Sequence, residues 1–154
     1  MVKILILILN ILIIANKINA NEPRYYFSPG VKIAYQLGDN TGVVFGFDFS
    51  IMRTLNNLPN YGVVTSIDFC NGNTKIHFGA QVAHILGIDI GPTIYITKKS
   101  TNFGFSTAIY GLLYFIPFFE YTKIFGDEDF SLIQNGLFLK YPIPTDEIKV
   151  RIDP

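Results

Sequence analysis

Apolar and polar residues alternate with a period of two through most of this chain. In the segment 41–51 the odd positions hold Val43, Phe45, Phe47, Phe49 and Ile51, whereas the even positions hold glycine, valine, aspartate and serine. A period of two places successive side chains on opposite faces of an extended strand. The segment therefore predicts a β-strand with one apolar face and one polar face.

The alternation recurs in eight segments that are separated by runs of turn residues, which are short except for the longer connection 52–60. The predicted strands are 31–37, 41–51, 61–69, 75–85, 88–97, 103–111, 113–123 and 131–141. Asn71–Gly72 is a strong hairpin signal, and Leu86–Gly87 is a second predicted turn. Because short connections pair consecutive strands as antiparallel neighbours, we expect an all-β fold, an up-and-down meander β-barrel of about eight strands.

Two prolines fall inside predicted strands. Pro92 and Pro117 cannot donate a ladder hydrogen bond, and a closed barrel has no free edge on which to place them. Each therefore predicts a bulge or a kink. Because of these two prolines, an open or distorted barrel is the alternative to a closed one.

The first twenty residues resemble a secretion signal. Lys3 supplies a positive start, the segment 4–15 is apolar apart from Asn10, and Ala20 is a small residue at the predicted cleavage site. The apolar run is shorter than the roughly 20 residues of a spanning helix. We expect a signal helix over 1–20, cleaved near Ala20, with an uncleaved anchor as the alternative. The predicted division is then a lead-in 21–30, a barrel 31–141 and a polar tail 142–154.

The composition of the polar face indicates which face points outward. Charged residues make up 16 % of the chain, against about 25 % in ordinary soluble domains. The polar face carries many small residues, which suit a crowded lumen and not a wet outer wall. They are Ala34, Gly42, Gly46, Gly62, Gly79, Ala83, Gly91, Gly104, Ala108 and Gly136. We therefore expect the apolar face to contact lipid and the polar face to line a packed lumen.

The charged residues of the polar face nearly balance. The predicted lumen network consists of Lys32, Asp48, Asp68, Lys75, His77, Gln81, Asp89, Glu120 and Lys140. Buried charges are tolerated when they are paired and hydrogen-bonded. We expect this network to fill a narrow barrel structurally, and a proton or ion route is the alternative.

The last predicted strand resembles the assembly signal of bacterial outer-membrane barrels. That signal runs polar, any, glycine, any, any, apolar, any, and then aromatic or apolar. Gln134, Gly136, Leu139 and Tyr141 fill these places. The resemblance is to the small eight-stranded outer-membrane class at the level of architecture. It implies export to the bacterial outer membrane and recognition by the barrel-assembly machinery, although this chain continues beyond the aromatic residue for the segment 142–154.

Several functional classes find no support in the sequence. The formal net charge is zero, so no basic field favours nucleic acid. Cys70 is the single cysteine and excludes an intramolecular disulfide. His77 and His84 have opposite parity, which argues against a shared metal site. Ser66, Asp68 and His77 share a predicted face and form a nominal catalytic set. We nevertheless expect no enzyme activity and no cofactor.

Three functions remain compatible with these observations. We expect an outer-membrane barrel with a packed polar lumen and a structural or partner-binding role in the cell envelope. The alternative is a soluble secreted or periplasmic barrel, similar to a lipocalin, that carries an apolar ligand. A second alternative is a membrane-embedded barrel enzyme that modifies lipid.

Overall fold

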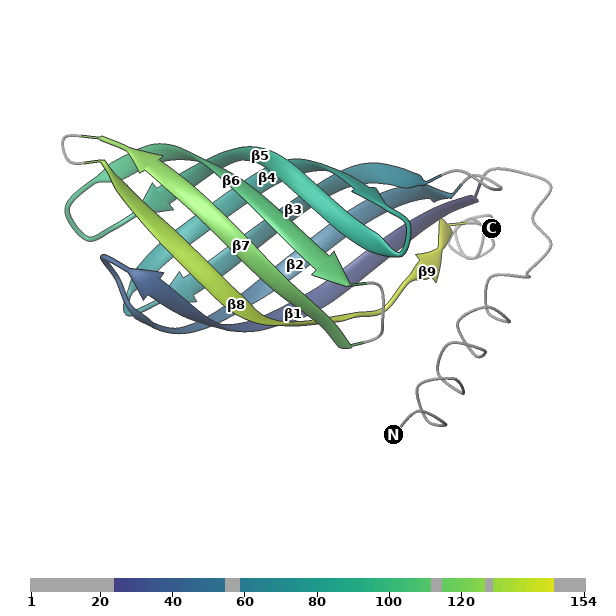
Figure 1. The fold of residues 1–154 in the computed structure, drawn as a ribbon, viewed down its shortest axis with the longest axis horizontal. Helices are drawn as coiled ribbons and strands as arrows, with labels where there is room; N and C mark the ends of the chain where they lie inside the picture. Colours follow the sequence, from purple (N-terminus) through teal and green to yellow (C-terminus); the bar gives the residue numbers. More distant parts are fainter. Residues whose placement is uncertain (1–23, 55–58, 112–114, 127–128, 146–154) are drawn as a thin grey trace, which may run out of the picture.

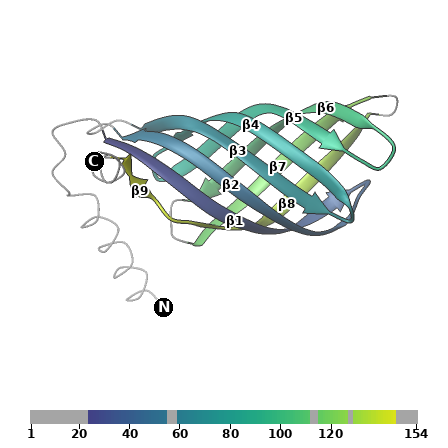
Figure 2. The same ribbon diagram turned by 180° about the vertical axis from the view of Figure 1, so that it is seen from behind.

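The protein folds into a closed antiparallel barrel of eight strands (Figures 1 and 2). The computed structural model describes residues 24–54, 59–111, 115–126 and 129–145. The predicted signal peptide and its cleavage site lie outside the described residues, as does the tail beyond residue 145. Among the residues that are described, no helix has the length and apolar character needed to span a membrane.

Each strand pairs with its neighbours in the chain, and β1 closes the ring by pairing with both β2 and β8. The strands are β1 (Arg24–Gly38), β2 (Gly42–Thr54), β3 (Asn60–Cys70), β4 (Asn73–Ala83), β5 (Leu86–Ile96), β6 (Thr101–Gly111), β7 (Phe115–Phe125) and β8 (Phe130–Lys140). A two-residue strand, β9 (Ile143–Pro144), pairs with Tyr26 and Phe27 beyond the end of β8. The predicted fold class is confirmed.

The two ends of the barrel differ. One end, here called the turn end, carries the connection after β1 and the Asn71–Gly72 connection after β3. Asn71 and Gly72 both have positive φ, 49° and 78°, as a tight two-residue hairpin requires. The other end, here called the termini end, holds the start of β1 and the end of β8, next to β9 (Figure 1).

The strand that closes the ring starts earlier than the sequence predicts. We expected the barrel to begin at Val31, but β1 begins at Arg24 and pairs with β2 along its length, from Arg24 opposite Thr54 to Gln36 opposite Gly42. The segment predicted as a lead-in contains Pro29 and Gly30, which weaken a strand pattern. This segment is nevertheless a strand, because the long strand β2 provides a continuous set of antiparallel partners for it.

The predicted turn at Leu86–Gly87 is wrong. The turn lies at His84–Ile85, and Leu86 and Gly87 begin β5. Gly87 is buried opposite Tyr110, and a Cβ at Gly87 would overlap the Tyr110 ring. This glycine therefore makes room for an aromatic side chain, and it does not mark a turn.

Neither internal proline introduces a bulge, because the pairing register is constant on both sides of each one. The β4–β5 ladder is interrupted between the pairs His77–Thr93 and Ala80–Ile90, where Pro92 lies. Pro117 lies one residue beyond the last β6–β7 pair, Tyr110–Phe118. Both prolines are exposed on the outer wall. Pro92 thus lies where the β4–β5 ladder is interrupted, and Pro117 lies where the β6–β7 ladder ends. At both places the barrel can stay closed although proline has no backbone N–H to donate.

Candidate functional site

The outer wall is apolar. Phe45 is 60 % exposed, Phe47 51 % and Phe103 68 %, and most outward-facing positions of every barrel strand are apolar. The opposite parity of these strands is buried and contains most of the charged residues of the barrel. A soluble barrel with an apolar cavity would require the reverse arrangement.

Four charged side chains form a closed cluster at the centre of the lumen. Lys32 Nζ lies 2.8 Å from Asp68 Oδ2 and 2.7 Å from Glu120 Oε2. Lys75 Nζ lies 3.0 Å from Asp68 Oδ2 and 2.5 Å from Glu120 Oε1. All four side chains are buried. Because two cations alternate with two anions, each charge has two opposite partners, which offsets part of the cost of removing it from water.

One further ion pair and one contact between a histidine and a carboxylate lie towards the termini end. Lys140 on β8 pairs with Asp48 on β2. His77 Nε2 lies 3.1 Å from Asp89 Oδ1. The four acidic side chains of the predicted network therefore each have a basic partner from another strand.

A belt of hydroxyl groups connects His77 to the central cluster. His77 Nδ1 lies 3.2 Å from Thr93 Oγ1, Thr93 lies 2.6 Å from Ser106, and Ser106 lies 2.7 Å from Thr122. The Thr122 hydroxyl then donates to Glu120 Oε1 at 3.3 Å. These residues come from β4, β5, β6 and β7 in order, so the belt runs around the barrel wall and not along its axis.

Amide side chains complete the polar interior. Gln134 Nε2 donates to Gln36 Oε1 at 2.8 Å, and Gln36 donates to the carbonyl of Asn40 at 2.6 Å. Gln81 accepts from the Tyr110 hydroxyl at 3.1 Å and donates to the Val63 carbonyl. All members of the predicted lumen network thus lie inside, and each has a partner.

Apolar layers lie on both sides of the charged cluster, and the predicted lumen network did not include them. Ile124 and Leu132 are fully buried with Tyr95 towards the turn end. Asn40 and Asn73 both donate to the Tyr95 hydroxyl at 3.1 Å. Towards the termini end lie Ala83, Tyr110, Ile116, Phe118 and Phe138, which belong to a buried group that also includes Ala34, Val44 and Cys70. The charged network is therefore enclosed between aromatic and aliphatic side chains.

Phe118 and Phe138 stack with ring centroids 4.2 Å apart, and Lys32 Nζ lies 4.7 Å above the Phe118 ring. A cation over an aromatic face is stabilised by the ring quadrupole. In the predicted strand 131–141, Phe138 shares the parity of Gln134 and Gly136, so its inward position could be read from the sequence. β7 has aromatic residues on both faces, so its alternation alone could not show that Phe118 points inward. Two observations did indicate this: Phe118 lies two residues before Glu120, and the neighbouring strand β8 places Phe138 inward.

Three residues of the predicted assembly signal lie in β8, on both of its faces, and the fourth, Tyr141, directly follows the strand. Gln134 is buried in the lumen, and Gly136 lies against Ala34, where an added Cβ would overlap the β1 backbone. Leu139 faces outward, and Tyr141 follows β8 and is 69 % exposed. The Tyr141 amide donates to the Pro29 carbonyl at 3.0 Å.

The nominal catalytic set does not assemble. Ser66 lies opposite His77 in the β3–β4 ladder, but the acidic partner of His77 is Asp89, whereas Asp68 binds the two lysines. All of these side chains are buried in the lumen and none reaches the outer wall. Within the described ranges, no group of three or more histidine, cysteine or acidic side chains has a geometry suited to a metal ion.

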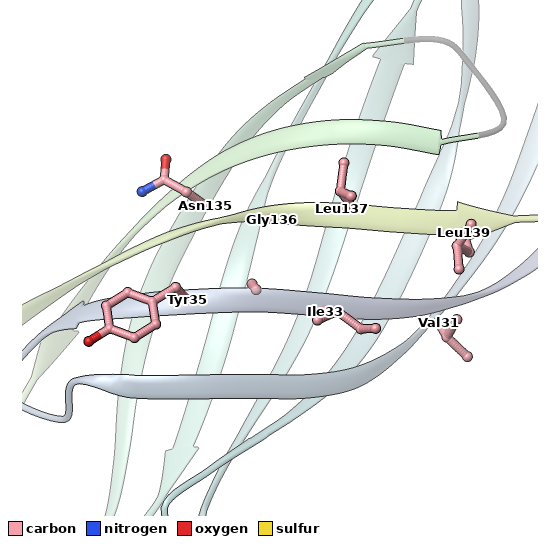
Figure 3. A pocket seen from close by; sticks show the side chains of 8 residues that line it. Val31, Ile33, Tyr35, Asn135, Gly136, Leu137 and Leu139 are labelled. Atoms are coloured by element: carbon pink, nitrogen blue, oxygen red, sulfur yellow. The ribbon is translucent and has the colours of Figure 1, made fainter.

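Two apolar hollows lie on the outside of the wall. One is an apolar groove of about 340 Å³ along the β1–β8 seam, lined by Ile33, Leu137 and neighbouring residues (Figure 3). The other, about 630 Å³, lies over β2, β3 and β4 between Phe49 and Phe78. Both are open grooves between outward side chains.

Together these features define the architecture of a small transmembrane β-barrel, with an apolar exterior and a filled, charged interior. Comparisons with protein-family models and with curated proteins find no match.

Solved structures with a similar fold include outer-membrane barrels. The Yersinia pestis outer membrane protein Ail in a phospholipid bilayer nanodisc matches at 12 % identity and a TM-score of 0.46, over 75 % of this chain and 99 % of that one. A crystal structure of Ail, the attachment invasion locus protein, matches at 12 % and 0.37, over 78 % and 99 %. A de novo designed transmembrane β-barrel matches at 11 % and 0.43, over 75 % and 95 %.

Proposed function

We propose that this protein is a bacterial outer-membrane barrel whose filled lumen does not conduct, and which has a structural or partner-binding role in the cell envelope. The observation that carries the proposal is the contrast between the two faces of the wall. Phe45, Phe47 and Phe49 are exposed, whereas Asp48 and Lys75 are 2 % exposed. An apolar surface of this extent is unfavourable in water and favourable in a bilayer.

The length of the apolar band supports a membrane location. On β2 the outward residues are apolar from Val43 to Ile51, and Arg53 follows. Eight residue steps at about 3.3 Å correspond to roughly 26 Å along the strand. A strand tilt of about 40° reduces this to roughly 20 Å along the barrel axis, which is close to the apolar band of about 25 Å in known barrels.

The interior supports a role without conduction. A pore for ions needs a continuous wet path, but the central cluster is neutral, paired and enclosed by apolar layers at both ends. The predicted secretion signal over 1–20 and the assembly signal in β8 support export and recognition by the barrel-assembly machinery. No enzyme activity forms part of the proposal.

Membrane fractionation tests the location. After expression in a bacterium with two membranes, the protein should remain in the outer-membrane pellet through a carbonate wash. Recovery in the soluble periplasm would exclude the proposal and favour the soluble ligand-carrying barrel. A planar-bilayer recording tests the lumen separately. The reconstituted barrel should give no current steps, and steady unitary conductance would contradict a filled lumen.

A further inference from the structure

One cation stands apart from the lumen, on the outer wall at the termini end. Arg53 lies one residue before the end of β2, on the same outward parity as the apolar residues from Val43 to Ile51. In the sheet it pairs with Tyr25 on β1 and with Tyr61 on β3. Tyr25, Arg53 and Tyr61 therefore form one row across three strands, directly beyond the apolar band.

The two tyrosines hold the guanidinium between them. The Arg53 guanidinium carbon lies 5.9 Å from the centre of the Tyr25 ring and 5.8 Å from that of Tyr61. Arg53 Nη1 donates to the Tyr61 hydroxyl at 2.6 Å. Two aromatic contacts and one hydrogen bond restrict a side chain that is otherwise rich in rotamers, so the guanidinium is oriented in advance for a ligand.

The remaining donors of this guanidinium suit an anion with several oxygens. Nε has no acceptor among the described residues, and Nε together with Nη2 forms one of the edges that bind carboxylate or phosphate bidentately. The Tyr61 hydroxyl accepts from Arg53 and keeps its own hydrogen for donation. Nε itself is buried, and Tyr25, one of the two aromatic neighbours of the guanidinium, is 46 % exposed, so binding through Nε requires a movement of the guanidinium or of a neighbouring side chain.

We propose that Arg53, Tyr25 and Tyr61 form a binding site for the phosphate of a phospholipid headgroup. The inference rests on the proposed membrane location, which places the row at the level where apolar chains give way to phosphates. Tyrosine is favoured at this level because its ring is apolar and its hydroxyl is polar. Tyr141, which follows β8 at the same end of the barrel, is also exposed.

Native mass spectrometry of the full-length barrel, extracted from lipid bilayers into a mild detergent, tests the site. The wild-type protein should retain one phosphatidylglycerol or phosphatidylethanolamine per barrel, and diacylglycerol, which lacks the phosphate, should not be retained. Arg53→Gln should reduce retention about tenfold, and Arg53→Lys should restore only part of it because a lysine cannot bind bidentately. Lys99→Gln, an exposed cation at the turn end, is the matched control and should leave retention unchanged.

The outcomes separate this inference from the proposed function. If the wild-type protein inserts into bilayers but Arg53→Gln retains as much phospholipid, the headgroup site is wrong and the membrane location stands. If the wild-type protein fails to insert, both are wrong. Inorganic phosphate alone is a further arm. Stoichiometric binding of free phosphate without lipid would assign the site to a soluble anion and overturn the lipid assignment. Heat-modifiable mobility on a gel verifies that each variant is folded.

Discussion

Lys32 on β1 and Glu120 on β7 are 88 positions apart in the chain, and their charged groups meet at 2.7 Å in the centre of the barrel. With Asp68 on β3 and Lys75 on β4, they connect four strands across the lumen. A pair of this kind contributes little net stability compared with a well-packed apolar core. It does favour this closure of the ring, because a one-residue slip of β1 would turn Lys32 away from the lumen and from its two carboxylate partners.

Glu120→Gln should therefore destabilise the barrel strongly. The change leaves Lys32 and Lys75 with one carboxylate between them, and an uncompensated buried charge costs about 3–5 kcal/mol. Denaturant unfolding in lipid vesicles, followed by far-UV circular dichroism, measures the loss. The double variant Lys32→Met with Glu120→Met keeps the cluster neutral and should lose less than the sum of its single changes. A loss of under about 0.5 kcal/mol for Glu120→Gln would contradict the role of the cluster, since that is the range of ordinary surface changes.

Phe47→Lys should impair insertion because Phe47 lies midway along β2 and faces outward. A lysine near the middle of the bilayer costs about 2–4 kcal/mol, and about 0–1 kcal/mol near the interface. Phe125→Lys is the matched control, because Phe125 is equally exposed, at 52 % against 51 %, but ends β7. Folding yield into vesicles measures both. Equal yields for the two variants would argue against a membrane around the middle of the wall.

The alternation of side chains made the strand count and the outward face predictable from sequence. On β2, the parity of Phe45 and Asp48 is strict, and a one-residue slip would reverse every side chain. For β7 the alternation alone did not show which face points inward, because Phe118 and Phe119 are neighbours of the same type on opposite faces. The structure shows that Phe118 is the inward residue and that it packs against Phe138.

The partners within the lumen were also beyond the reach of sequence. Parity places Lys32, Asp68 and Glu120 inside, but the choice of partner depends on the diameter of the barrel and the tilt of its strands. The pairing of His77 with Asp89, and not with Asp68, follows from that geometry. Glycines were ambiguous for a related reason, since Gly87 suits a turn and a crowded lumen equally well in sequence.

Gly91→Ala tests the close approach of strands near Pro92. A Cβ at Gly91 would overlap the carbonyl oxygen of Phe78 and the Cα of Gly79, both backbone atoms. Overpacking of this type costs about 1–3 kcal/mol, and thermal unfolding in detergent measures it. At Gly111 the nearest atom to an added Cβ is Pro117 Cδ at 3.5 Å, an ordinary contact. Gly111→Ala should leave the barrel close to wild-type stability, and comparable losses at the two positions would refute the steric explanation.

Removing β9 should open the edge of β1 at the termini end. β8 pairs with β1 only from Gly30 onward, so the free edge of the first residues of β1 is covered by Ile143 and Pro144. Thr145 Oγ1 also donates to the Tyr25 carbonyl at 3.1 Å. An uncovered edge exposes unpaired backbone groups to exchange and to pairing with another chain.

A chain that ends at Tyr141 should therefore show faster hydrogen exchange in the segment 24–29, measured by mass spectrometry. Exchange in β5, which is far from β9 in the strand order, is the internal control and should not change. The same truncation should increase dimers on native gels, because one exposed β1 edge can pair with a second copy. Unchanged exchange in 24–29 would mean that β9 contributes no protection, and β2 alone would then hold this half of β1 in place.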